Sequence, residues 1–228
     1  MKIKINKPRL FLIALSVICL SAALTSCNKP SGSSNVSAGA AVKIVNAVNG
    51  SASQDLYINN NRIDASAVAY GQSSGYYTVT SGVYPAKFTD ANSATANASF
   101  SVSLAPGNYY SVYYATNDTT KTEVVAQNDQ TAPSSGMAKV RFINLSSAIS
   151  SGIDFGVSGS TKLATSLAYK AVSAYNQIAA NTTFFLYASG SVTSSLTIPT
   201  TIQAGKIYTI YVTGATTLNL NFFVVAEN

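Results

Sequence analysis

Alternating side-chain character predicts strands along this chain. From Tyr109 to Tyr114, and again from Ile207 to Val212, successive residues fall into two sets with a period of two, as in a β-strand. We expect the more apolar set of each segment to face a core and the other set to face outward. The predicted core positions are Tyr110, Val112, Tyr114, Tyr208, Ile210 and Val212, and the predicted outward positions are Tyr109, Ser111, Tyr113, Ile207, Thr209 and Tyr211.

A glycine-containing turn precedes each of these two segments, and a tyrosine follows the glycine by three residues. The turns are Leu104–Tyr110 (LAPGNYY) and Ile202–Tyr208 (IQAGKIY). This is the pattern of a tyrosine corner, in which the phenol hydrogen-bonds to the turn backbone of a β-sandwich. Tyr110 and Tyr208 are therefore the predicted corner residues, and two corners predict two sandwiches.

Other segments recur in the same order, which indicates a tandem repeat. They are Val42–Asn46 with Val140–Asn144, Asp55–Tyr57 with Asp154–Gly156, Ala69–Tyr70 with Ala168–Tyr169, Ser74–Tyr76 with Ser173–Tyr175, and Val124–Asn128 with Val224–Asn228. We predict domains over residues 41–128 and 138–228, joined by a linker over 129–137 that contains Pro133 and Gly136.

Each repeat contains many short β-rich runs separated by Gly, Asn, Ser or Asp, and neither shows a helical stripe. We therefore predict an all-β chain with two tandem immunoglobulin-like β-sandwiches. The expected strands of the first repeat lie near Val42–Val48, Gln54–Ile58, Gly75–Thr80, Val83–Thr89, Ala98–Leu104, Tyr109–Thr116 and Thr122–Gln127.

The amino terminus has the features of a signal peptide over residues 1–26. A basic start is followed by the apolar run Leu10–Leu24, which is short for a bilayer span. The ending Leu24-Thr25-Ser26-Cys27 resembles a bacterial lipobox, and the resemblance implies lipidation of Cys27 and cleavage before it. The alternative is an ordinary signal peptide that leaves Cys27 as a free thiol. The Ser/Gly-rich stretch that begins at Cys27 and ends at residue 40 is the predicted tether.

The two repeats resemble the 4397 family of domains of unknown function, which is common in bacterial envelope lipoproteins. The matching segments are Lys139–Leu145 in the first strand, Ile202–Ile210 in the turn, and Val68–Tyr76 in the middle of the repeat. The second copy departs from the pattern at Lys170, where the first copy has Gly71. The resemblance implies an immunoglobulin-like fold in a Gram-negative envelope and no established chemistry.

Composition excludes several classes of function. The chain has no His, so a Ser-His-Asp or Cys-His catalytic arrangement cannot form. Of its fourteen basic residues, four lie in the first ten positions, so cleavage would leave a nearly neutral chain with no basic run for nucleic acid. The run Asn59–Asp64 is rich in oxygen ligands but lacks the ligand spacing of a calcium loop, and we interpret it as a hairpin turn. We expect no enzyme activity, no cofactor and no metal site.

Three tyrosines are the candidate ligand-binding residues. Tyr109, Tyr113 and Tyr211 are predicted to face outward, where flat rings could stack on sugars. The alternative, which we favour, is packing within the sheet or at the interface between the domains. Separately, Asp118-Thr119-Thr120 resembles an O-glycosylation acceptor with Thr119 as the modified residue.

These features predict a non-catalytic envelope lipoprotein whose sandwiches are spacer or interaction modules for a protein or cell-surface partner. The alternative is a surface lipoprotein that binds glycans through exposed tyrosines. The lipid at Cys27 would attach the protein to a membrane. In enteric bacteria an Asp directly after the lipidated cysteine retains a lipoprotein in the inner membrane. This chain has Asn28 there, which favours the outer membrane, and the sequence does not determine whether the domains face the periplasm or the cell surface.

Overall fold

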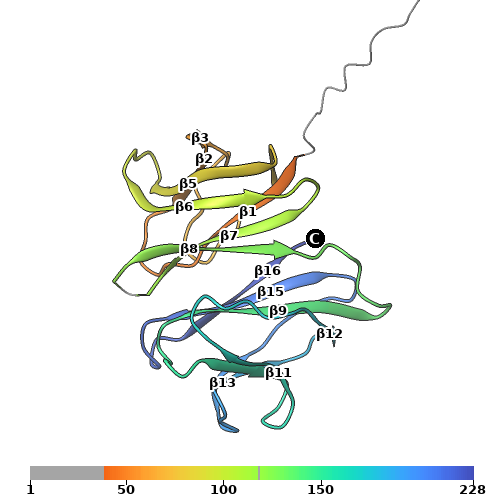
Figure 1. Cartoon of the computed structure of the whole chain (residues 1–228). Helices are drawn as coiled ribbons and strands as arrows, with labels where there is room; N and C mark the ends of the chain where they lie inside the picture. The colour runs from red at the N-terminus through yellow and green to blue at the C-terminus, as the bar shows by residue number, and fades with distance from the viewer. Residues whose placement is uncertain (1–38, 118) are drawn as a thin grey trace, which may run out of the picture. The chain divides into compact units, whose positions relative to one another are not determined.

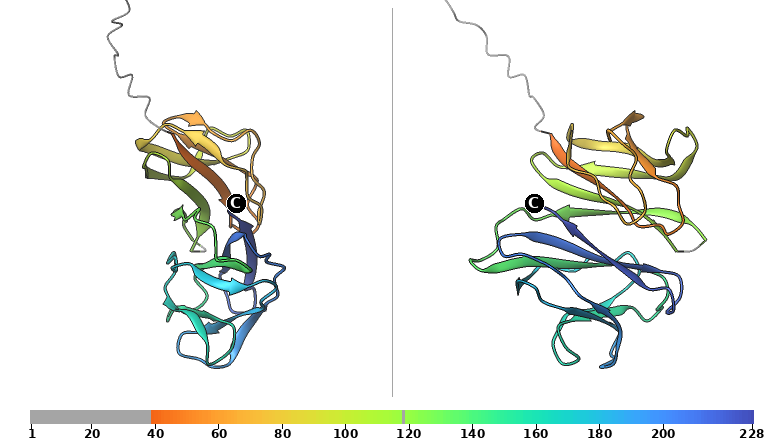
Figure 2. Two further views of the ribbon diagram at one scale, coloured as in Figure 1. Left: turned by 90° about the vertical axis from the view of Figure 1, so that its right-hand side faces the viewer. Right: turned by 180° about the vertical axis from the view of Figure 1, so that it is seen from behind.

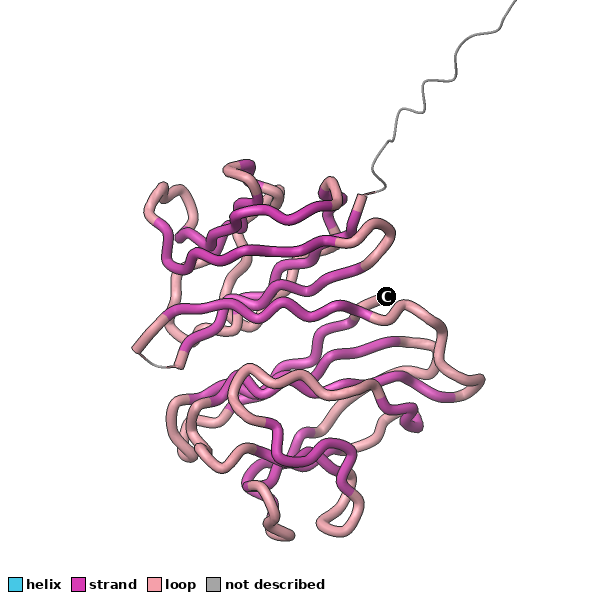
Figure 3. The backbone as a smooth tube through the Cα atoms, viewed as in Figure 1, coloured by secondary structure: helices cyan, strands magenta, loops and turns pink. Residues whose placement is uncertain are grey.

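The computed structural model describes residues 39–117 and 119–228 (Figure 1). The predicted signal peptide, Cys27, Asp118 and nearly all of the tether lie outside the described residues. Within the described part all regular secondary structure is β-strand, which confirms the predicted fold class (Figure 3). No helix in this part of the chain could span a bilayer.

Each repeat contains eight strands. Those of the first repeat are β1 (Ala40–Asn46), β2 (Gln54–Ile58), β3 (Asn61–Arg62), β4 (Tyr77–Val79), β5 (Gly82–Asp90), β6 (Ala96–Leu104), β7 (Tyr109–Thr116) and β8 (Lys121–Asn128). Those of the second repeat are β9 (Met137–Ser146), β10 (Ile153–Gly156), β11 (Lys162–Leu167), β12 (Asn176–Ala179), β13 (Phe184–Ala188), β14 (Ser194–Ile198), β15 (Ile207–Gly214) and β16 (Asn221–Ala226). All seven runs expected in the first repeat are strands, and β3 is the additional one.

The two repeats share one topology, a pair of four-stranded sheets. The first repeat has the strand orders β4-β1-β7-β8 and β3-β2-β5-β6, and the second has β12-β9-β15-β16 and β11-β10-β13-β14. In both, the first strand pairs in parallel with the seventh, so that β1 lies beside β7 and β9 lies beside β15. Figure 2 shows the strands of both sandwiches from two further directions.

Each sandwich has its own hydrophobic core between its two sheets. Tyr110, Val112 and Tyr114 lie in the first core, as the alternating pattern predicts. Ile210 and Val212 lie in the second core, and Tyr208 packs against it. The more apolar set of each segment therefore faces inward in both repeats.

The corner tyrosines make the contacts that their position predicts. The phenol oxygen of Tyr110 accepts a hydrogen bond from the backbone N–H of Ala105 at 3.0 Å. The phenol oxygen of Tyr208 accepts one from Gln203 at 3.2 Å. The glycine of the first turn, Gly107, has φ 74°, which a residue with a side chain rarely adopts.

The hairpin between β2 and β3 accounts for the asparagine-rich run. Asn59 and Asn60 form a two-residue turn with φ 50° and 61°. Asparagine tolerates this left-handed backbone better than most residues, and such turns suit the twist of a hairpin. The interpretation as a hairpin is confirmed.

A third apolar cluster joins the repeats and corrects part of the sequence prediction. It contains residues of β1, β7 and β8 together with residues of β9, β15 and β16. Five of the six positions predicted to face outward are buried: Ser111, Tyr113, Ile207, Thr209 and Tyr211 are each 0% exposed. The outward prediction was wrong for them because each sandwich covers the sheet face of the other.

Candidate functional site

The two sheets β4-β1-β7-β8 and β12-β9-β15-β16 meet at a contact that we call the seam. A basic residue of the first strand of each repeat lies at its centre. Lys43 is in β1 and Arg141 is in β9, and they are only 5% and 2% exposed. Burying a charge in this way is costly unless it is paired and hydrogen-bonded. The partners of these two cations therefore define the polar part of the seam.

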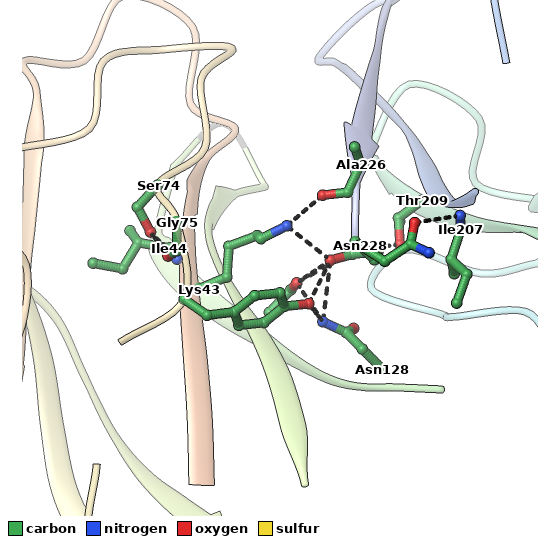
Figure 4. A network of polar contacts seen from close by, with 12 residues as sticks. Lys43, Ile44, Ser74, Gly75, Asn128, Ile207, Thr209, Ala226 and Asn228 are labelled. Atoms are coloured by element: carbon green, nitrogen blue, oxygen red, sulfur yellow. Dashed lines mark hydrogen bonds and ion pairs between the residues drawn. The ribbon is translucent and has the colours of Figure 1, made fainter. Parts of the chain in front are cut away.

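Lys43 of the first repeat reaches the end of β16 in the second repeat (Figure 4). Its ammonium donates to the carbonyl oxygen of Ala226 and forms an ion pair with Glu227, with an N–O distance of 3.3 Å. The same ammonium lies 4.4 Å from the centre of the Tyr76 ring. Burial lowers the pKa of Lys43, and the carboxylate of Glu227 opposes this effect.

Arg141 of the second repeat reaches the end of β8 in the first repeat. Its Nη1 donates to the carbonyl oxygen of Gln127 at 2.7 Å, and its Nη2 donates to Oδ1 of Asn128. Its Nε donates to Thr209 at 2.9 Å within its own sheet. The guanidinium also lies 4.9 Å from the centre of the Tyr175 ring. Every nitrogen of this side chain thus has a partner.

Glu227 is the acceptor on which both repeats converge. This carboxylate is 1% exposed, and it accepts hydrogen bonds from Thr209 at 2.7 Å, Tyr76 at 2.9 Å and Ser111 at 3.1 Å. The amide nitrogen of Asn128 donates to it at 3.1 Å, and Arg141 lies 3.7 Å away. A buried carboxylate with this many donors is well compensated, so the network ties the sheets together.

Two of the candidate ligand-binding tyrosines are part of the apolar side of the seam. The rings of Tyr113 and Tyr211 meet edge to face with centroids 5.5 Å apart, and Tyr211 stacks on Phe223 at 5.2 Å. Burial raises the pKa of both phenols. The assignment of Tyr113 and Tyr211 as ligand contacts was therefore wrong, because neither ring can reach a ligand in solution. The packing alternative is the correct one for them.

Tyr109 is the only one of the three that lies at the surface, and it lines a groove at one edge of the seam. Its side chain is 37% exposed, and its ring meets that of Tyr76 at 5.1 Å. The groove has a volume of about 820 Å³ and is also lined by Gln127, Asp129 and Tyr175. Its wall therefore combines aromatic faces, an amide and a carboxylate, which suits a polar ligand or peptide segment.

Asp129 and the linker are fixed at the same edge. The carboxylate of Asp129 forms an ion pair with Lys139 at 2.7 Å, and Lys139 also donates to the Thr131 carbonyl at 2.8 Å. The hydrogen bond from Lys139 lowers the pKa of Asp129 to about 2. This part of the linker is thus held against the start of β9.

The aspartates that recur in the two repeats have structural partners. Asp154 accepts hydrogen bonds from the backbone N–H groups of Ser166 at 2.7 Å and Gly190 at 3.1 Å. Asp55 and Asp64 are both buried and share Arg62, at 3.0 and 2.9 Å. Burial, and next the neighbouring Asp64, raise the pKa of Asp55. The described residues contain no group of three or more His, Cys, Asp or Glu side chains that could hold a metal ion.

Thr119 lies in the exposed turn between β7 and β8. Its hydroxyl donates to the side-chain oxygen of Asn117 at 3.2 Å. Asp118, which the proposed glycosylation motif requires, is outside the described residues. Modification of Thr119 stays a prediction.

Comparison with known proteins identifies the family. The model of a domain of unknown function, DUF4397, matches residues 40–151, which include all of the first repeat, the linker and β9. This part of the chain belongs to the DUF4397 family. No match is found among curated proteins.

Solved structures add no argument to the family assignment. The TIE protein of Bacillus anthracis is 11% identical with a TM-score of 0.21, and the similarity covers 77% of this chain and 34% of that one. The present chain thus spans about a third of its length. A family CBM26 module of Eubacterium rectale Amy13K, solved with maltoheptaose, is 12% identical with a TM-score of 0.27, covering 83% and 97%. At these scores neither similarity indicates a function.

The polar centre of the seam was not predicted from the sequence. Lys43 and Arg141 were matched as parts of a repeated strand, but their roles were not inferred. A basic residue at one position of an apolar strand in both copies was the available signal, because such a residue needs a buried partner. The acid that supplies it, Glu227, is far away in sequence and gave no signal of its own.

Proposed function

We propose that this chain is a non-catalytic lipoprotein of the outer membrane, anchored through Cys27, whose two repeats form one joined spacer and interaction module. The observation that carries the proposal is the buried seam. Independent modules on a flexible linker would leave Tyr113 and Tyr211 exposed, whereas here both are 0% exposed. A pair of sandwiches joined in this way can present residues of both repeats to a partner as one surface.

The groove beside Tyr109 is the surface that we assign to the partner. It combines a partly exposed ring with Gln127 and Asp129, and it lies where both repeats and the linker meet. Interface contacts are commonly made by aromatic side chains with polar groups around them. A protein of the envelope is the partner that we propose. Tyr113 and Tyr211 are not available for glycan binding, because both rings are buried.

Site-specific photo-crosslinking in cells tests this function. A photoreactive phenylalanine at position 109 should give a discrete adduct with an envelope protein, while the same residue at the control position Leu218 should not. Leu218 is 97% exposed but lies in the β15–β16 turn and does not line the groove. Equal adducts at both positions, or none at 109, would contradict an interaction through the groove.

The anchor is tested in the same cells with Cys27→Ser. The wild-type protein should fractionate with membranes and carry lipid, because thioether-linked acyl chains at this residue supply the attachment. The variant should carry no lipid and should appear as uncleaved precursor or in the soluble fraction. Lipid on the Cys27→Ser protein would refute the anchor but would leave the crosslinking result standing.

A further inference from the structure

The seam has the symmetry of an interface between two like subunits. Strand pairing places Gln127 opposite Tyr110 in the first repeat and Ala226 opposite Tyr208 in the second, so Gln127 and Ala226 are structural equivalents. It follows that Asn128 is the equivalent of Glu227. The match of Val124–Asn128 with Val224–Asn228 in the sequence was therefore wrong by one residue.

With this register, the contacts of the two cations are reciprocal. Lys43 binds the backbone carbonyl of Ala226 and the side chain of Glu227. Arg141 binds the backbone carbonyl of Gln127 and the side chain of Asn128. Each cation thus holds the same two positions at the end of the other repeat. Contacts that are exchanged in this way are the mark of an isologous interface.

Asn128 and its equivalent Glu227 differ in charge, and this difference decides the charge balance at the centre of the seam. Asn128 supplies an amide where Glu227 supplies a carboxylate, so a single acid serves two buried cations. A pair made from two first repeats would bury two copies of Lys43 with no acid between them. The first repeat therefore needs a partner that brings a carboxylate at the position of Glu227, since an unpaired buried charge is strongly unfavourable.

The loops at the rim of the seam are also equivalent but differ in chemistry. In the first repeat Gly71, with φ 74°, lies directly against the ring of Phe223, which leaves no room for a side chain. In the second repeat the equivalent Lys170 donates to the Thr122 hydroxyl at 2.9 Å and lies 3.8 Å from Glu123. Each loop thus contacts the last strand of the other repeat.

We propose that the seam is a recognition surface that acts without the linker. The pair requires one carboxylate at either of the two equivalent positions, 128 or 227. Because the first repeat has Asn128, its partner must be a module of the same fold that brings the acid, and here that module is the second repeat. This inference concerns how the repeats recognise each other, and it goes beyond the proposed function. Failure of the crosslinking experiment at Tyr109 would leave it unaffected.

Cleavage of the folded full-length protein tests the proposal. A protease site inserted between Ser135 and Gly136, both of which are exposed, allows the linker to be cut after folding. The two halves should co-elute in size exclusion at low micromolar concentration. Halves that elute separately while each keeps its strand signal in circular dichroism would overturn the proposal.

Moving the acid from one repeat to the other tests the requirement for one carboxylate at position 128 or 227, which we call the code. In the cut protein, Glu227→Gln should raise the dissociation constant of the halves at least tenfold. The double variant Asn128→Asp with Glu227→Gln should restore co-elution, because Arg141 then faces the carboxylate and the donor and acceptor of the 128–227 hydrogen bond are simply exchanged. The matched control is Glu227→Gln with Gln203→Glu, which has the same net charge but places the acid on an exposed turn residue, and it should not restore co-elution.

Each outcome decides the question. A double variant that behaves like Glu227→Gln, or a control that restores association equally well, would refute the code. Unchanged association of the single Glu227→Gln variant would refute it as well. If the single variant loses its strand signal, recovery of the signal by the double variant and not by the control supports the code, and loss of the signal in both refutes it.

Discussion

At the scale of single residues, the same side-chain type has different roles according to which face of its strand it occupies. Tyr110 and Tyr113 are three positions apart in β7, and both are buried. Tyr110 lies in the core of its own sandwich, where its hydroxyl accepts the turn N–H. Tyr113 lies on the opposite face and packs against the second repeat. The period of two separated these residues correctly, but it could not reveal what covers the outer face.

The corner hydrogen bonds give the first prediction at this scale. Tyr110→Phe and Tyr208→Phe should each lower the free energy of unfolding by about 1–3 kcal/mol, because the turn N–H loses its acceptor. The midpoint of urea denaturation measures the change. Tyr109→Phe is the matched control and should have little effect, because Tyr109 lies at the surface and is 37% exposed. Midpoints unchanged from wild type for both corner variants would show that these hydrogen bonds do not contribute to stability.

At the scale of elements, strand positions were predictable because local pattern and turn chemistry agree. The expected runs from Gln54 to Ile58 and from Tyr109 to Thr116 coincide with β2 and β7. Turn residues set the boundaries, as Asn59 and Asn60 do after β2. The second half of β1 is buried on both faces, because the second repeat covers the face that points away from the first core.

The β2–β3 hairpin gives a prediction for one element. Asn60→Val should lower stability by about 1–2 kcal/mol, because a β-branched residue is strained at the φ of 61° that this position requires. Asn61→Val is the control, since this neighbour is also exposed but lies in β3. It loses only an exposed hydrogen bond to the Asn59 carbonyl, so it should change stability by less than about 0.5 kcal/mol. Added calcium should alter the denaturation midpoint of neither variant. Equal effects of the two substitutions would contradict the role of the turn backbone.

At the scale of the whole molecule, the buried tyrosines of the seam and of the first core determine how the protein responds to alkaline pH. Burial raises the pKa of Tyr114, Tyr169 and Tyr175 to about 12. It also raises the pKa values of Tyr76, Tyr113 and Tyr211. In the unfolded chain a phenol ionises near pH 10, so between about pH 10 and 12 the folded protein retains protons that the unfolded chain has lost. Stability from these groups is complete below that window and falls as the pH rises through it.

Alkaline titration checks this prediction. The midpoint of urea denaturation should fall steeply above about pH 10, and the ultraviolet signal of ionised phenol should rise together with the loss of folded structure. Tyr84→Phe is a suitable control and should show the same dependence on pH as the wild type. This phenol is only partly buried and donates to the backbone of Ser81 outside the seam. A wild-type denaturation midpoint that stays constant to about pH 11.5 would contradict the predicted loss of stability.

The sequence alone determined the all-β class, the two repeats, the strands of the first repeat and the corner tyrosines. These follow from side-chain alternation, turn residues and internal repetition, which act over a few residues or recur along the chain. Only the tertiary structure decided that Tyr113, Tyr211, Lys43 and Arg141 are buried against the other repeat. Their environment depends on residues of the other repeat, as that of Lys43 depends on Glu227, and no local pattern specifies how two sheet faces meet.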